Sequence, residues 1–165
     1  MEALLVFKLK IISWNVNSLR AREPLVQHLI DKEKPDLLCL QELKIDDQKY
    51  VYDFFQPYSY ETISQNQKSY NGVSISYPKK IEVKNMTFSN LNEIQARNNV
   101  LLLEQQGLAI INNYFPNGNP IDTDKFSFKL NWMDLLYEQV RDLKKNFEIV
   151  PVSYTHLTLP TILLV

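Results

Sequence analysis

The sequence has one cysteine, almost no net charge and no long hydrophobic run, and each shortage excludes a class of protein. A single cysteine, Cys39, cannot build a disulfide framework, and its place inside an apolar run predicts a buried small hydrophobe. A formal net charge of -1 argues against a strongly basic, non-specific nucleic-acid binder, so local clusters of cations must supply any phosphate contact. No stretch approaches the length of a membrane span, so we expect no membrane partner.

The length and composition indicate at most one domain. Of the 165 residues, 45% are hydrophobic and 22% are charged. The apolar stretch at residues 1–7 is interrupted by Lys8 and Lys10 and carries no cleavage site, so it does not read as a signal peptide. This composition is typical of an intracellular enzyme, and we expect a cytoplasmic monomer.

Apolar runs bounded by turn residues predict a series of strands. The predicted strands lie at residues 9–14, 37–41, 58–63, 72–77, 81–85, 99–104 and 108–114, and another begins at 147. Between residues 58 and 114 only turns, such as the one at 77–80, separate these runs, which predicts antiparallel pairing there.

Two amphipathic helices are predicted to cover the strands. The first spans residues 23–34, with Pro24 in its first turn and with Leu25, Leu29 and Ile30 at helical spacing. The second spans residues 124–146, and its predicted apolar face consists of Phe126, Leu130, Met133, Tyr137, Val140 and Leu143. Mixed sheets flanked by helices, an α/β fold, follow from this order of elements.

Two of the predicted strands end in polar side chains. The apolar run at 37–41 ends in Glu42, and the run at 9–14 leads to Asn15 and then to Arg20 and Arg22. Lone charges are rarely buried, so Glu42 is either an ordinary acid at the solvent end of its strand or is paired with a cation. A strand that delivers a carboxylate at its tip is a common way to hold a metal ion.

Four segments together resemble a known family. They are Ser13 to Arg20 (S-W-N-V-N-S-L-R), Pro35 to Lys44 (P-D-L-L-C-L-Q-E-L-K), Lys68 to Val73 (K-S-Y-N-G-V) and Asn113 to Gly118 (N-Y-F-P-N-G). In this order they resemble the exodeoxyribonuclease III and apurinic/apyrimidinic endonuclease family, within the endonuclease/exonuclease/phosphatase superfamily. The resemblance runs from about residue 8 to about residue 150, and Ser18 stands where the family usually has glycine.

The resemblance implies a fold, a reaction and a metal. The family folds as a four-layer α/β sandwich of two packed sheets, of which this chain would form part, with the C-terminal portion missing. It implies hydrolysis of phosphodiester bonds in double-stranded DNA at abasic sites and 3′ ends, with Mg²⁺ or alternatively Mn²⁺. Magnesium prefers hard oxygen ligands and keeps several waters, so Glu42 with Asn15 beside it is enough to start a site. A turn amide bonded to its own backbone is the alternative for Asn15.

The resemblance also assigns residues to the phosphate and to DNA. Tyr114 matches the active-site tyrosine, whose phenol lies against the scissile phosphate, and Asn117 matches a second amide on the phosphate side. A packing tyrosine and a plain turn residue are the alternatives for these two. The residues expected to contact DNA are Arg20, Arg22, Lys44, Tyr70 and Asn71. The ring of Tyr70 could stack, its hydroxyl could bond a phosphate oxygen, or it could simply cover the sheet edge.

Two other functions fit the same residues. One is another phosphoesterase of the superfamily, acting on a phospholipid or an inositol phosphate. The other is an inactive remnant that binds DNA without cutting it. Lys44, directly after the Gln41-Glu42-Leu43 segment, and the loop that carries Tyr70 favour the nuclease.

The last fifteen residues do not continue the family pattern. The strand that begins at 147 runs in the family into a Gly-Asp-x-Asn motif, which this sequence lacks. Residues 153–161 (S-Y-T-H-L-T-L-P-T) instead resemble translated sequencing-adapter DNA, and a divergent natural terminus is the alternative. We therefore expect residues 1–150 to be the N-terminal part of the domain and 151–165 a non-native tail. We also expect the chain to be inactive and to leave apolar faces of the 124–146 helix and of strands 99–104 and 108–114 uncovered.

Reading the source DNA past the codon for Val150 tests this interpretation. We expect an open frame that continues into Gly-Asp-x-Asn and, much later, an Asp-His pair. An authentic stop codon directly after Val165 in independent reads would contradict it.

Overall fold

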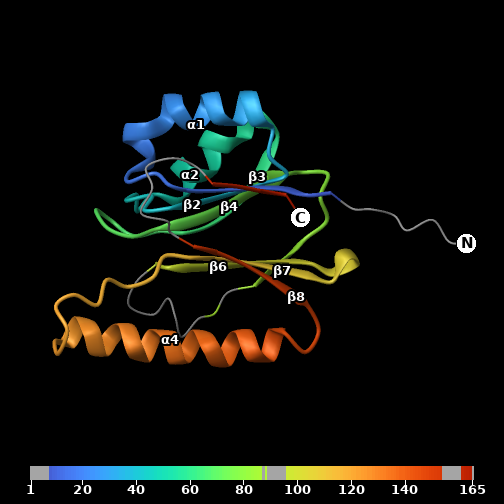
Figure 1. Ribbon diagram of the computed structural model, residues 1–165. Coiled ribbons are helices and arrows are strands. Elements are labelled where there is room, and N and C mark those ends of the chain that lie inside the picture. The colour runs from blue at the N-terminus through green and yellow to red at the C-terminus, as the bar shows by residue number, and fades with distance from the viewer. Residues whose placement is uncertain (1–7, 87, 89–95, 154–160, 165) are drawn as a thin grey trace, which may run out of the picture.

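The computed structural model describes residues 8–86, 88, 96–153 and 161–164, and these form four layers (Figure 1). Helices α1 (Leu19–Glu33) and α2 (Gln48–Phe55) form the first layer and α4 (Asp124–Leu143) the last. Two sheets lie between them. The predicted α/β sandwich of two mixed sheets flanked by helices is confirmed.

The first sheet has the strand order β3-β4-β2-β1-β9. Its strands are β1 (Lys10–Asn15), β2 (Leu37–Gln41), β3 (Tyr60–Gln65), β4 (Val73–Pro78) and β9 (Thr161–Leu164). β1 and β2 are parallel, and the other pairs are antiparallel. Short 3-10 helices, η1 (Gln56–Tyr58) and η2 (Glu104–Gln106), follow α2 and β6.

The second sheet has the order β5-β6-β7-β8. Its strands are β5 (Lys84–Met86), β6 (Asn98–Leu103), β7 (Leu108–Asn113) and β8 (Glu148–Ser153). β7 and β8 are parallel, whereas β5–β6 and β6–β7 are antiparallel. The predicted antiparallel pairing over residues 58–114 is therefore confirmed for β3–β4, β5–β6 and β6–β7.

That prediction is wrong for the turn at residues 77–80. β4 and β5 belong to different sheets, so this segment carries the chain from one sheet to the other and does not close a hairpin. The reason is visible in the packing, since Ile81 and Val83 contact the apolar layer between the two sheets. The strand predicted at 81–85 is consequently reduced to the three residues of β5.

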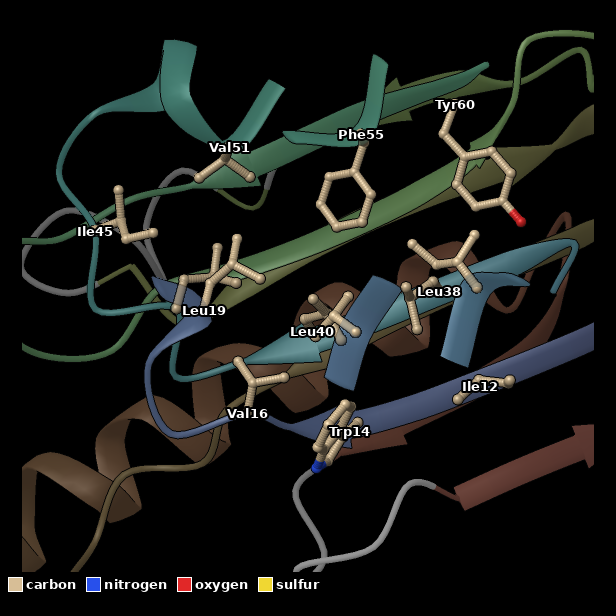
Figure 2. Packing of buried hydrophobic residues seen from close by; sticks show 13 residues of the cluster. Ile12, Trp14, Val16, Leu19, Leu38, Leu40, Ile45, Val51, Phe55 and Tyr60 are labelled. Carbon is tan, nitrogen blue, oxygen red and sulfur yellow. The ribbon is translucent and has the colours of Figure 1, made fainter. Parts of the chain in front are cut away.

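The outer face of the first sheet packs against α1 and α2 (Figure 2). Alternate residues of β1 and β2 point to this side, as expected for strands. The buried cluster includes Ile12 and Trp14 of β1, Leu38 and Leu40 of β2, and Phe55 of α2. Burial of this kind is the main force that holds a helix on a sheet.

The other residues of the same strands form a layer between the two sheets. Ile11, Leu37 and Cys39 face Leu101 and Ile110 of the second sheet there. A third apolar layer lies between the second sheet and α4. It contains Val100, Leu102, Ala109 and Ile111 from the strands and Trp132, Leu136 and Leu143 from the helix. β6 and β7 are thus covered on both faces, and the expectation that they would be left uncovered is wrong.

The apolar face predicted for the 124–146 helix is also wrong in part. Trp132, Leu136 and Leu143 are buried, whereas Leu130, Met133 and Tyr137 are exposed. Trp132 has the largest apolar side chain of the helix, and its edge-to-face contact with Phe115, at 5.1 Å between ring centroids, turns its side of α4 toward the sheet.

The first helix begins earlier than predicted. Ser18 caps α1 by accepting a hydrogen bond from the backbone N–H of Ala21 at 3.5 Å, so Pro24 lies inside the helix and not in its first turn. Leu25 is exposed because Val26, the next residue, faces the sheet.

Helix α2, which Asp47 caps, was not predicted from the sequence. No helix in the described ranges is long and apolar enough to cross a bilayer.

The burial of Cys39 provides a direct test of the layer between the sheets. Its side chain is fully buried, and burial raises the pKa of the thiol to about 12. A protonated and shielded thiol is unreactive. We expect the folded 165-residue chain to resist a thiol reagent at mildly alkaline pH and to react with one equivalent in concentrated guanidinium. Equally fast labelling in both solutions would show that this layer does not form.

Candidate active site

Three loops meet at one end of the first sheet. They follow β1, follow β2 and precede β4, and all three lie at the same edge because β1 and β2 are parallel while β4 is antiparallel to β2. Backbone hydrogen bonds join them: Ser18 N–H donates to Glu42 O at 2.8 Å, and Lys44 N–H donates to Asn71 O at 3.0 Å. The polar strand ends predicted from the sequence are therefore brought together.

These loops contain several residues in the left-handed backbone region. Glu42 has φ 56°, Lys44 56°, Asn71 51° and Ser18 89°. Ser18 occupies the position where the resembled family usually has glycine, and its φ explains that preference. Gly72 has φ 88°, and a Cβ there would lie 3.0 Å from Cβ of Leu43. Residues held in such conformations cluster at functional sites.

Glu42 lies at the centre of a polar cluster. Asn15 Nδ2 donates to its Oε1 at 2.7 Å, and Lys44 Nζ lies 3.2 Å from its Oε2. Lys44 also donates to Oδ1 of Asn17. Burial by itself would raise the pKa of Glu42, but hydrogen bonds from Asn15, Lys44 and Tyr114 and the charge of Lys44 outweigh it and lower that pKa. The carboxylate is therefore held ionised.

Tyr114 reaches this cluster from the second sheet. It follows β7 directly, and its backbone N–H donates to Arg97 O at 2.8 Å. Next to this cluster, Gln41 Nε2 of the first sheet donates to Oδ1 of Asn112 of the second sheet at 2.7 Å and so joins the two sheets. The Tyr114 hydroxyl and the Glu42 carboxylate, 72 residues apart in the sequence, are thereby placed within hydrogen-bonding contact.

Two members of the cluster were not predicted from the sequence. Asn17 holds Lys44, and the amides alternating at Asn15 and Asn17 could have signalled it. Arg97 is 8% exposed and places its guanidinium carbon 4.8 Å from the ring centroid of Tyr114. Burial lowers the pKa of Arg97, whereas the proximity of Tyr114 and Glu42 raises it. In the sequence, the signal for Arg97 was weak: a lone cation two residues before the predicted strand at 99–104.

A groove of about 600 Å³ lies beside Tyr114. Tyr70, Asn71, Arg97, Tyr114, Asn117 and Lys125 are among the residues that line it. Tyr70 is 69% exposed, so it does not cover the sheet edge. Asn117 Oδ1 accepts a hydrogen bond from the Asn119 N–H at 3.1 Å, which is the geometry of a turn residue. Asn71 is buried, and its Nδ2 donates to Gln67 Oε1 at 2.7 Å, so its side chain stabilises the loop that precedes β4.

The two arginines predicted to contact DNA lie on the first turns of α1. The guanidinium carbon of Arg20 lies 4.7 Å from the ring centroid of Tyr50. Arg22 donates to the carbonyl of Ala21 at 3.4 Å. The contacts described for these arginines join neither of them to Glu42, so the structure brings Lys44 but not Arg20 or Arg22 to the cluster.

Glu42 is the residue of this cluster that could hold a cation, because the groups that face it from Asn15, Lys44 and Tyr114 are hydrogen-bond donors. Within the described residues, no three His, Cys, Asp or Glu side chains are grouped as a metal site. Glu42 therefore offers a single ionised carboxylate, and the ammonium of Lys44 already lies against it. A single ionised carboxylate is a hard oxygen ligand that could hold a divalent cation in place of the ammonium, with waters as the other ligands.

Comparison with known proteins agrees with this geometry. Residues 12–141 match the Endonuclease/Exonuclease/phosphatase family. Exodeoxyribonuclease III of Haemophilus influenzae is 32% identical over 114 residues, which cover 67% of this chain and 42% of that protein. A DNA-(apurinic or apyrimidinic site) endonuclease of Dictyostelium discoideum is 28% identical over 134 residues, covering 79% of this chain and 37% of that protein.

Solved structures show the same fold. The 3′-5′ exonuclease from Neisseria meningitidis superimposes with a TM-score of 0.76 at 35% identity, covering 88% of this chain and 57% of that one. An AP endonuclease from Archaeoglobus fulgidus gives a TM-score of 0.72 at 31% identity and covers 88% and 56%. The chain thus spans roughly half the length of the proteins that it matches. It belongs to the Endonuclease/Exonuclease/phosphatase family, and the relatives that it matches include an exodeoxyribonuclease III and AP endonucleases.

Proposed function

We propose that the full-length protein, meaning the frame that continues past Val150, is a Mg²⁺-dependent DNA repair nuclease. It would hydrolyse phosphodiester bonds at abasic sites and at the 3′ ends of double-stranded DNA. The contact between Glu42 of one sheet and Tyr114 of the other, beside a groove, is the observation that supports this most directly. The substrates follow from relatives named exodeoxyribonuclease III and apurinic or apyrimidinic site endonuclease. A related Neisseria 3′ phosphatase has been solved bound to a product DNA hairpin.

The polar groups of the cluster suit a reaction at phosphorus. Negative charge grows on the phosphate oxygens in the transition state, and donors that are already fixed there lower the barrier. The hydroxyl of Tyr114 and the ammonium of Lys44 are two such donors. Because the side-chain oxygen of Asn117 is bonded to Asn119, its NH₂ group is the donor that it would offer a phosphate.

Glu42 would hold the metal ion, with Mn²⁺ an alternative because it takes similar oxygen ligands. Asn15 turns its NH₂ group toward Glu42 and its Oδ1 toward the N–H of Asn17. Asn15 therefore orients the carboxylate, and its oxygen would reach an ion only after the amide flips. When bound, Mg²⁺ supplies positive charge against the phosphate and lowers the pKa of a coordinated water.

A phosphoesterase acting on a phospholipid or an inositol phosphate would use a similar carboxylate and tyrosine. The groove favours DNA, because the exposed ring of Tyr70 lines it and is available to a base or to the sugar-phosphate backbone. Lys44 adds a cation for a backbone phosphate.

Replacing Glu42 tests the metal assignment. In the full-length protein we expect Glu42→Gln to keep the fold and to lower cleavage of an abasic-site duplex by roughly a hundredfold or more, the scale of losing one preorganised electrostatic contact. The reason is that an amide offers the ion a neutral oxygen instead of a charged one. The measurement is the cleavage rate across a magnesium titration, in which high magnesium restores part of the activity.

Glu104→Gln is the matched control, since Glu104 is an exposed acid that pairs with Lys84 far from the cluster. It is expected to leave the rate and its magnesium dependence unchanged. Wild-type activity of Glu42→Gln at low magnesium would remove Glu42 from the metal site.

We expect residues 1–165 alone to form no productive complex with DNA and not to cut it. In the resembled family the Asp of Gly-Asp-x-Asn orients the attacking water and an Asp-His pair completes the phosphate site, and the printed sequence contains neither motif. Losing part of a constellation that acts as a unit removes most of its effect. The measurement compares the 165-residue chain with the full-length protein on an abasic-site duplex with magnesium.

The same assay separates the alternatives. Metal-dependent cleavage by the 165-residue chain would contradict the expected inactivity. If the full-length protein instead hydrolyses an inositol phosphate, it is the alternative phosphoesterase of the superfamily and not a nuclease. DNA binding without cleavage by the full-length protein would identify a binding remnant.

A further inference from the structure

Arg97 is a buried cation that holds one residue from two sides. Its guanidinium carbon lies 4.8 Å from the ring centroid of Tyr114, and the guanidinium donates to the carbonyl oxygens of Tyr114 at 3.1 Å and Phe115 at 3.3 Å. Its own carbonyl accepts the N–H of Tyr114 at 2.8 Å. The ring and the main chain of Tyr114 are therefore both fixed by Arg97.

Burial of the Arg97 cation would be unfavourable without these partners. Burying a cation is unfavourable unless it is paired and hydrogen-bonded, and Arg97 is 8% exposed. The preceding residue, Ala96, is held on both sides of its backbone, since the N–H of Gly72 donates to Ala96 O at 2.9 Å and the N–H of Ala96 donates to Gln67 Oε1 at 3.2 Å. The backbone beside Arg97 is thus tied to the loop that precedes β4.

Only arginine can make all of these contacts at once. Its planar guanidinium lies against an aromatic ring and donates through several N–H groups in fixed directions. A lysine ammonium keeps the charge, but it is a point donor on a flexible stem and cannot form the same set. Charge and geometry can therefore be separated by experiment.

We propose that Arg97 is a positioning residue that fixes the ring and main chain of Tyr114 so that the phenol hydroxyl stays at Glu42. This inference rests on the proposed function, because it assigns Arg97 a part in the same phosphoester reaction. Arg97 acts through Tyr114 and need not touch the substrate.

The test uses the full-length protein and the variants Arg97→Lys, Tyr114→Phe and their combination. We expect Arg97→Lys to lower kcat on an abasic-site duplex by about tenfold to a hundredfold, the scale of a small misplacement of a reacting group, while KM changes much less. Tyr114→Phe keeps the ring and removes the hydroxyl. On that background Arg97→Lys should cause no further loss, because both changes remove the same contribution.

A spectroscopic measurement reports the position of the ring without any activity. Residues 1–165 contain nine tyrosines, and the Tyr114 signal in the ¹⁹F spectrum of 3-fluorotyrosine-labelled protein is identified by its absence in Tyr114→Phe. In Arg97→Lys this signal should move toward that of the exposed Tyr70, while the other signals stay in place. Arg141→Lys is the matched control, since Arg141 lies on α4 with its guanidinium carbon 5.9 Å from the ring centroid of Tyr137. It should change neither kcat nor the Tyr114 signal.

Several outcomes would overturn the proposal: wild-type kcat in Arg97→Lys, an unmoved Tyr114 signal, or losses that multiply in the double variant. If Arg97→Lys does not fold by circular dichroism, the planar and uncharged Arg97→Gln takes its place. Failure of both variants to fold would make Arg97 a folding residue and overturn its positioning role. A wild-type protein that cuts no DNA would count against the proposed nuclease, while the ¹⁹F comparison would still decide whether Arg97 positions Tyr114.

Discussion

The hydrogen bond between Gln41 and Asn112 joins the two sheets at the end where the candidate active site lies. Gln41 Nε2 also donates to Ser13 Oγ at 3.1 Å, and Asn112 Nδ2 donates to the carbonyl oxygens of Leu40 and Ser74 at 3.0 and 2.9 Å. Gln41 and Asn112 are fully buried, where unpaired polar groups are costly, so the pair fixes the spacing and register of the sheets.

This bridge explains why an active site can form between two separate sheets. Glu42 directly follows Gln41, and Tyr114 lies two residues after Asn112. Next to it, Asn98 Nδ2 donates to Asn113 Oδ1 at 2.7 Å and ties the ends of β6 and β7 together. Apolar packing between sheets is not directional, whereas hydrogen bonds are, so the polar end of the layer sets the position of the catalytic groups and the apolar remainder supplies most of the stability.

The cluster around Glu42 shows how a small set of residues prepares a carboxylate for a cation. Asn15 fixes one carboxylate oxygen, Lys44 neutralises the other, and Asn17 in turn holds Lys44. The loops that carry them adopt left-handed backbone conformations that cost energy and persist because the loops bond to one another. The charge is therefore present in the folded protein before any ligand arrives.

The sequence by itself determined where most of the strands lie to within one or two residues, the α/β class and the residues that match the family motifs, because apolar runs and short motifs are local properties. It placed Glu42, Asn15 and Tyr114 at strand ends, and the tertiary structure brings these three together. Only the tertiary structure decided that residues 77–80 cross between sheets, that Trp132 and not Met133 faces the core, and that Arg97 lies against Tyr114. Each of these depends on which distant residue supplies a partner, and the spacing of residues along the chain does not identify that partner.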